Sequence, residues 1–135
     1  MPIDRLDHYS VRARDVKVTR DFYVDIVGLS DGYRPDFPFP GAWLYAGDRA
    51  VVHLIGVDPG DSTGLTDYLG DKADAAEGSG NLDHVAFVAS GFDAMRARFQ
   101  ELGAKFHERE VPGLKLRQVF LTDPNGVVVE LNFPG

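Results

Sequence analysis

The sequence predicts an α+β protein made of two copies of one module, each reading strand, helix and then three strands. The tripeptide Leu-Asp-His occurs twice, in LDHYSV (6–11) and in LDHVAF (82–87), an offset of 76 residues. The segment WLYAGDRAVVHLI (43–55) matches FLTDPNGVVVELN (120–132) at an offset of 77 residues. Because both ends of the unit repeat in nearly the same register, we expect an internal duplication.

The first module, about residues 4–57, begins with an alternating strand over about 6–13. Asp15 has a typical N-cap side chain, and Gly28 marks the end of the helix that follows. Two weaker strands are expected over about 31–35 and 41–46, and the last ends near residue 55. The helix is expected to pack one apolar stripe against the sheet: Val18, Phe22, Tyr23, Ile26 and Val27.

The second module, about residues 81–135, repeats this order. A strand over about 82–89 precedes a helix that ends at Gly103, with strands over about 104–109 and 115–121 behind it. The turn Pro124-Asn125-Gly126 leads into the last strand. The apolar stripe of this helix is Phe92, Met95, Phe99 and Leu102. The whole chain of 135 residues fits one domain, in which paired modules close a cleft between their uncovered sheet faces.

Composition excludes several classes of function. The net charge is −7, which argues against a basic nucleic-acid-binding face. The chain has no cysteine, so disulfides and thiolate ligands are absent. No apolar run is long enough for a membrane span, and no signal segment opens the sequence. We expect a cytoplasmic protein that binds neither nucleic acid nor membrane.

The linker between the modules, about 58–80, is strongly acidic. Residues 58–77 contain one base, Lys72, against six acids: Asp58, Asp61, Asp67, Asp71, Asp74 and Glu77. Such a segment is typical of a solvated loop. The alternative is a mobile lid over a site.

Four polar residues stand at equivalent positions in the two modules. His8 matches His84 at the first strand, and His53 matches Glu130 on the last. A single histidine on an apolar strand is usually structural, and an edge strand could leave Glu130 in water. The duplication nevertheless brings all four toward one centre. Imidazole and carboxylate donors suit a divalent metal ion such as Fe, Zn, Ni, Mn or Co.

The aspartates beside two of these histidines receive no role at this point. Strand alternation places Asp7 and Asp83 on the face opposite to His8 and His84. We therefore do not expect them to contact those imidazoles.

The chain resembles the vicinal oxygen chelate superfamily, which includes glyoxalases, bleomycin resistance proteins and extradiol dioxygenases. The resemblance covers LDHYSVRARDVKVTRDFYVDIVGL, LDHVAF and LTDPNGVVVEL. It implies paired βαβββ modules that form a cupped mixed sheet around a metal, with ligands from the first and fourth strands. The implied ligands are His8, His53, His84 and Glu130. The metal would chelate two vicinal substrate oxygens.

The resemblance leaves the activity open. The lead expectation is a metal-dependent lyase or isomerase of glyoxalase type, acting on a small carbonyl or vicinal-oxygen substrate, with Glu130 or His53 moving the proton. A one-domain Fe(II) dioxygenase for a catechol-like ring would use His8, His84 and Glu130 as ligands and His53 as an acid–base, although Phe120 stands where a tyrosine is usual. The third expectation is a binding or resistance protein, whose family members usually lack the ligands.

A homodimer is expected, because pairing of two chains covers exposed sheet edges. Further residues are expected around the substrate. Aromatic side chains of the first module could form an apolar wall, although aromatics mostly fill cores. Basic side chains could meet an anionic substrate or be solvated at the surface. The expected substrate-binding residues are Arg12, Trp43, Tyr45, Lys115 and Arg117.

Overall fold

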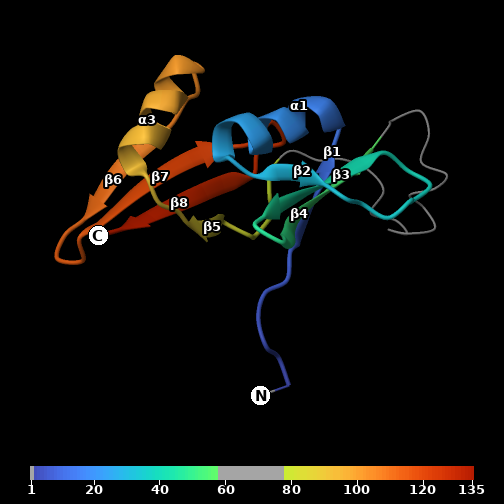
Figure 1. Cartoon of the computed structure of the whole chain (residues 1–135), viewed down its shortest axis with the longest axis horizontal. Coiled ribbons are helices and arrows are strands. Elements are labelled where there is room, and N and C mark those ends of the chain that lie inside the picture. The colour runs from blue at the N-terminus through green and yellow to red at the C-terminus, as the bar shows by residue number, and fades with distance from the viewer. Residues whose placement is uncertain (1, 58–77) are drawn as a thin grey trace. The chain divides into compact units, whose positions relative to one another are not determined.

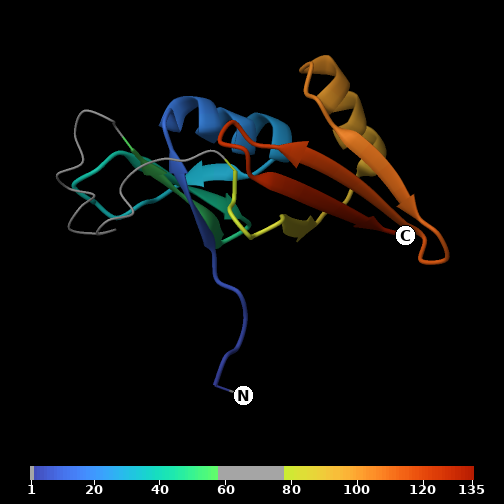
Figure 2. The ribbon, with the colours of Figure 1, turned by 180° about the vertical axis from the view of Figure 1, so that it is seen from behind.

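The computed structural model describes residues 2–57 and 78–135. The chain separates into two compact units, Met1–Ala76 and Glu77–Gly135, so the boundary falls inside the expected linker. The acidic segment 58–77, for which a solvated loop or a lid was expected, lies outside the described residues. Figures 1 and 2 show the two units from opposite sides.

The first unit has the expected strand–helix–strand–strand–strand order. It contains β1 (Tyr9–Ala13), helix α1 (Val16–Asp21) continued by the π-helical segment η1 (Phe22–Val27), β2 (Ser30–Gly32), β3 (Gly41–Ala46) and β4 (Arg49–Gly56). The strands form one sheet in the order β1-β4-β3-β2. β1 runs parallel to β4, and the other pairs are antiparallel. The sheet is therefore mixed, with its first and last strands side by side.

The helix of the first unit covers one face of this sheet (Figure 1). The Asp15 side chain accepts a hydrogen bond from Val18 N, and Gly28 ends the helical segment at φ 96°, as predicted. Val18 was expected in the apolar stripe but is 51% exposed, so it lies on the solvent-facing side of α1. The core below combines helix and sheet residues: Thr19, Phe22, Tyr23, Val27, Leu44, Val52 and Leu54.

The second unit repeats the topology. It contains β5 (Val85–Val88), α3 (Phe92–Glu101), β6 (His107–Val111), β7 (Leu116–Thr122) and β8 (Val128–Pro134). Its sheet has the order β5-β8-β7-β6, and β5 is parallel to β8. The protein is thus an α+β fold of two βαβββ modules, as the sequence predicted.

Phe99 anchors α3 to the second sheet. It is fully buried, and its ring lies 5.3 Å from that of Phe106. Leu102 was expected in the same stripe but is 49% exposed, because it lies beyond the last helical turn that meets the sheet. The rest of this core comes from alternate positions of β7 and β8: Val119, Leu121, Val129, Leu131 and Phe133.

The register of the strands confirms that the two modules are copies. Ser10 pairs with His53 in the first unit, and Ala86 pairs with Glu130 in the second. His8 and His84 each lie two residues before those partners. On the other side, Trp43 pairs with His53 and Phe120 pairs with Glu130. Because Leu44, Leu54, Leu121 and Leu131 alternate with these residues and are buried under the helices, the polar pairs lie on the opposite sheet faces.

None of the helices in the described part of the chain is both long and apolar enough to cross a membrane.

Candidate metal-binding half-sites

A stack of three rings dominates the polar face of the first unit. The rings of His8 and His53 lie 3.7 Å apart with an interplanar angle of 13°, and those of Trp43 and His53 lie 3.9 Å apart at 8°. His53 comes from β4 and Trp43 from the neighbouring position on β3. Because His8 and Trp43 both lie this close to His53 and nearly parallel to it, they must cover opposite faces of its ring. His53 is therefore held between His8 and Trp43.

His53 is set up as a neutral base. Its Nε2 lies 3.1 Å from Ala50 O, and a carbonyl can only accept, so Nε2 carries the proton. The remaining ring nitrogen, Nδ1, then has the free lone pair. Burial lowers the pKa of His53 below 6.5, and the nearby His8 lowers it further. A neutral imidazole with one free lone pair can accept a proton or bind a metal.

This arrangement predicts a pH-dependent signal from Trp43, which is the only tryptophan of the chain. Because the pKa of His53 is lowered in the fold, its contribution to stability is present above the unfolded pKa near 6.5 and is lost as the pH falls through the folded pKa. A protonated imidazole quenches a stacked indole, so the fluorescence should fall at that lower pH. His53→Asn should abolish the step, and the exposed His107→Asn should keep it. A step that persists without His53 would contradict the stack.

Glu130 is the central polar group of the second unit. Glu130 is only 8% exposed, and a carboxylate buried to this extent requires hydrogen-bonding or charged partners. Its Oε1 lies 3.6 Å from His84 Nε2, and its Oε2 accepts a hydrogen bond of 2.8 Å from Asn132 Nδ2. Asn132 Oδ1 in turn accepts from Gln118 Nε2 at 3.0 Å. Asn132 thus holds one oxygen of Glu130, Oε2, while the other, Oε1, faces His84.

The two aspartates without an expected role contact the histidines directly, so the expectation was wrong. Asp7 Oδ2 lies 2.7 Å from His8 Nδ1, and Asp83 Oδ2 lies 2.7 Å from His84 Nδ1. Alternation does not apply, because β1 begins at Tyr9 and β5 at Val85, after each Asp-His pair. The contact with His8 lowers the pKa of Asp7, and the contact with Asp83 raises the pKa of His84.

Imidazole nitrogens and carboxylate oxygens are suitable ligands for a divalent metal ion. Each unit holds one pair of such side chains, His8 with His53 and His84 with Glu130, and we call each pair a half-site. Within residues 2–57 and 78–135, no three or more metal-ligating side chains are grouped closely enough to hold an ion. In the second unit, His84 Nε2 and Glu130 Oε1 face each other and could both reach one ion. In the first, lone pairs lie in the ring planes, and two parallel stacked rings do not converge on a point about 2.0–2.1 Å from each nitrogen. The stack therefore admits His8 or His53 as a ligand, not both.

The expected substrate residues of the first unit lie differently. Trp43 is part of the ring stack. Arg12 is partly buried on β1, two residues after Ser10 and therefore on the same face of the sheet. Because Ser10 pairs with His53, this is the face that carries His53. Tyr45 donates its hydroxyl proton to Tyr33 O at 2.6 Å, which ties β3 to the segment after β2.

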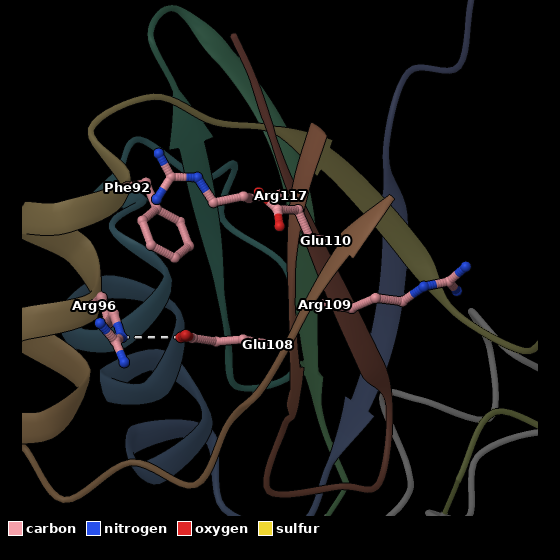
Figure 3. Close-up of a pocket in the computed structure, with 6 residues that line it drawn as sticks. All are labelled: Phe92, Arg96, Glu108, Arg109, Glu110 and Arg117. Carbon is pink, nitrogen blue, oxygen red and sulfur yellow. Dashed lines mark ion pairs between the residues drawn. The ribbon is translucent and has the colours of Figure 1, made fainter. Parts of the chain in front are cut away.

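Arg117 and Lys115 are not near Glu130 in the second unit. Arg117 lies on the helix-covered face of the sheet, where its guanidinium carbon is 4.2 Å from the ring centre of Phe92 (Figure 3). Arg117 and Phe92 line a pocket of about 320 Å³ on this face. Arg96 and Glu108 line the same pocket and form an ion pair, with 2.9 Å between Arg96 Nε and Glu108 Oε2. Lys115 is exposed in the turn between β6 and β7.

The fold agrees with a comparison of the whole sequence with known families. A model described as the Glyoxalase/Bleomycin resistance protein/Dioxygenase superfamily matches residues 5–131. The chain belongs to this superfamily. This glyoxalase/dioxygenase superfamily contains enzymes, and its members commonly bind divalent metals and small molecules.

One relative and two solved structures show how far the sequence of this chain differs from those of similar proteins. Glyoxylase I 4 of Arabidopsis thaliana is 26% identical over 129 residues, which cover 93% of this chain and 68% of that protein. A glyoxylase/bleomycin resistance protein/dioxygenase domain from Frankia sp. EAN1pec has a TM-score of 0.71 at 18% identity, covering 98% and 99% of the two chains. A mutant of the fosfomycin resistance protein FosX from Listeria monocytogenes, in complex with Mn(II) and a dihydroxypropylphosphonic acid, has a TM-score of 0.69 at 17% identity, covering 98% and 94%.

Sequence reasoning missed the polar groups behind the candidate ligands. Asp7 and Asp83 could have been found from the repeated Leu-Asp-His, since the aspartate recurs with the histidine. Asn132 lies two residues after Glu130, on the same strand face, and alternation alone would have drawn attention to it. The link from Asn132 to Gln118 needed the β7–β8 register, which no local pattern reveals.

Proposed function

We propose that this protein is a metal-dependent lyase or isomerase of glyoxalase type, acting on a small substrate with a carbonyl or vicinal oxygens. We assign His8, His84 and Glu130 as ligands of a divalent metal and His53 as the residue that moves a proton. The observation that carries the proposal is the matched pair of half-sites. In each unit a histidine just before the first strand has an aspartate on Nδ1 and lies two residues before the partner of a polar residue on the fourth strand.

The chemistry divides between the bound group and the chain. A divalent metal would act as a Lewis acid on a substrate oxygen. His53 is neutral at physiological pH because its pKa is lowered, and Ala50 O holds its Nε2–H, so Nδ1 can take a proton from the substrate carbon and return it. Glu130 was also expected to move a proton. Since Asn132 fixes it beside His84, we assign it to holding the metal.

A second function is favoured by the same stack. If His53 is no ligand, the remaining set is two histidines and one carboxylate, which suits non-haem Fe(II) and a dioxygenase that opens a catechol-like ring. Oxygen uptake with catechols by iron-loaded protein, without any lyase or isomerase turnover, would select this function. Ligand binding that survives chelation, with no turnover, would select a binding protein.

The ligand assignment predicts the behaviour of a His53→Ala variant. Purified without added metal, the variant should contain as much divalent metal as the wild-type protein, because the stacked ring is not a ligand. Its turnover should fall about 10²–10⁴-fold, the usual contribution of a general base. Elemental analysis of both proteins measures the first point, and steady-state rates measure the second. Loss of the metal from His53→Ala would make His53 a ligand and overturn the assignment.

Assembly belongs to the same proposal. We propose that the protein is a homodimer. Analytical ultracentrifugation of the purified protein would measure the mass of the assembly directly. A monomeric mass would refute this part alone.

A further inference from the structure

We propose that Asp7 and Asp83 are positioning residues, which hold Nδ1 of His8 and His84 and thereby present the Nε2 lone pair of each ring for metal binding. This inference rests on the proposed function for its metal, but the contacts it concerns belong to the metal-free protein. Each aspartate precedes its histidine directly, and each contact measures 2.7 Å.

The repetition of the contact carries the argument. Asp7 is 73% exposed and Asp83 is 92% exposed, and an exposed carboxylate would ordinarily remain in water because such pairs stabilise a fold by little. The same contact nevertheless forms in both units, although the residues that follow, Tyr9-Ser10 and Val85-Ala86, are unlike. The shared feature is the position, just before the strand that pairs with β4 or β8.

The backbone at these positions does not orient the rings. Both histidines precede the first hydrogen-bonded residue of their strands, so no sheet ladder restrains them. Their side chains are also about one-third exposed, at 36% and 38%. A bond to the adjacent carboxylate restricts a ring rotation that the ladder leaves free, and in the first unit the stack on His53 restricts it as well. In the second unit the ring then directs Nε2 toward Glu130 Oε1.

The chemistry of the contact selects one tautomer. A carboxylate only accepts, so Nδ1 must carry the proton and Nε2 keeps its lone pair in the neutral ring. A carboxylate on the far nitrogen also raises the basicity of the nitrogen that binds the metal. Both effects strengthen a metal–imidazole bond without adding a ligand.

Metal affinity tests the first consequence. We expect Asp83→Ala and Asp7→Ala each to weaken Zn²⁺ or Ni²⁺ binding about 10–100-fold, as outer-sphere partners of ligating histidines do. Competition with a chromophoric chelator gives the dissociation constants. The matched controls are Asp93→Ala in the second unit and Asp4→Ala in the first, which remove the same charge from exposed positions and should change the affinity less than about twofold. Affinities in the Asp7 and Asp83 variants equal to those of the controls would overturn the inference while leaving the metal site standing.

Ring-nitrogen NMR of the metal-free protein tests the second consequence and does not depend on the metal. At about pH 9, above the ordinary histidine range, His8 and His84 should show protonated Nδ1 and unprotonated Nε2. In Asp7→Ala and Asp83→Ala the matching ring should shift to a mixture of tautomers. If the wild-type protein binds no divalent metal, the proposed function fails, and this spectrum still decides the inference. The Nε2–H tautomer in the wild type, or an unchanged tautomer in the variants, would overturn it.

Discussion

Replacing Glu130 with Gln is expected to weaken divalent-metal binding by more than about 100-fold, beyond the range that outer-sphere partners account for. The substitution keeps the shape of the side chain and lets Asn132 Nδ2 still donate to an amide oxygen. It removes the anionic donor that faces His84 Nε2 at 3.6 Å. The metal-free variant should unfold at the same temperature or a higher one, because a carboxylate that is only 8% exposed no longer has to be desolvated. Titration with metal and thermal unfolding measure the two effects.

The matched control is Glu110→Gln, an exposed glutamate on β6 of the same unit. It removes the same charge without touching His84 or Asn132, and it should leave metal affinity within about twofold. Unchanged metal binding in Glu130→Gln, beside a folded and unchanged control, would remove Glu130 from the ligand set and leave the second unit with one donor.

Phe99→Ala is expected to lower the free energy of unfolding of the second unit by about 3–5 kcal/mol. Phe99 is fully buried between α3 and the sheet and contacts Phe106, so its removal leaves a cavity that the strands cannot close. Small domains have a total stability of about 5–15 kcal/mol, so the loss is a large share of the whole. Urea denaturation followed by far-ultraviolet circular dichroism measures it.

The position of the only tryptophan extends this experiment. Trp43 lies in the first unit, so its fluorescence follows that unit, whereas circular dichroism follows both. Equal shifts of the two signals would show that the units unfold together. A shift in circular dichroism alone would show that they unfold separately. Leu102→Ala, at an exposed position at the end of α3, should change stability by about 0.5 kcal/mol or less. An equally small effect of Phe99→Ala would show that Phe99 does not anchor the helix.

Periodicity predicted the elements well where burial alternates with exposure. Leu44, Val52 and Leu54 are buried at the spacing expected of strands, and Phe22, Tyr23 and Val27 at that of a helix. The strand ends were less predictable. LDHYSV and LDHVAF continue the alternation to Leu6 and Leu82, but the ladders begin only at Tyr9 and Val85. The wrong conclusion about Asp7 and Asp83 came from that difference of about three residues.

The sequence alone determined the duplication, the order of elements in each module and the equivalence of His8 with His84 and of His53 with Glu130, because these depend on local pattern and on comparison of the chain with itself. Only the tertiary structure decided what those residues contact. The stack on His53, the fixed oxygen of Glu130 and the aspartates on the two histidines each depend on strand register or on where a ladder begins. Pairing between distant strands sets these features, and no periodicity within a strand encodes them.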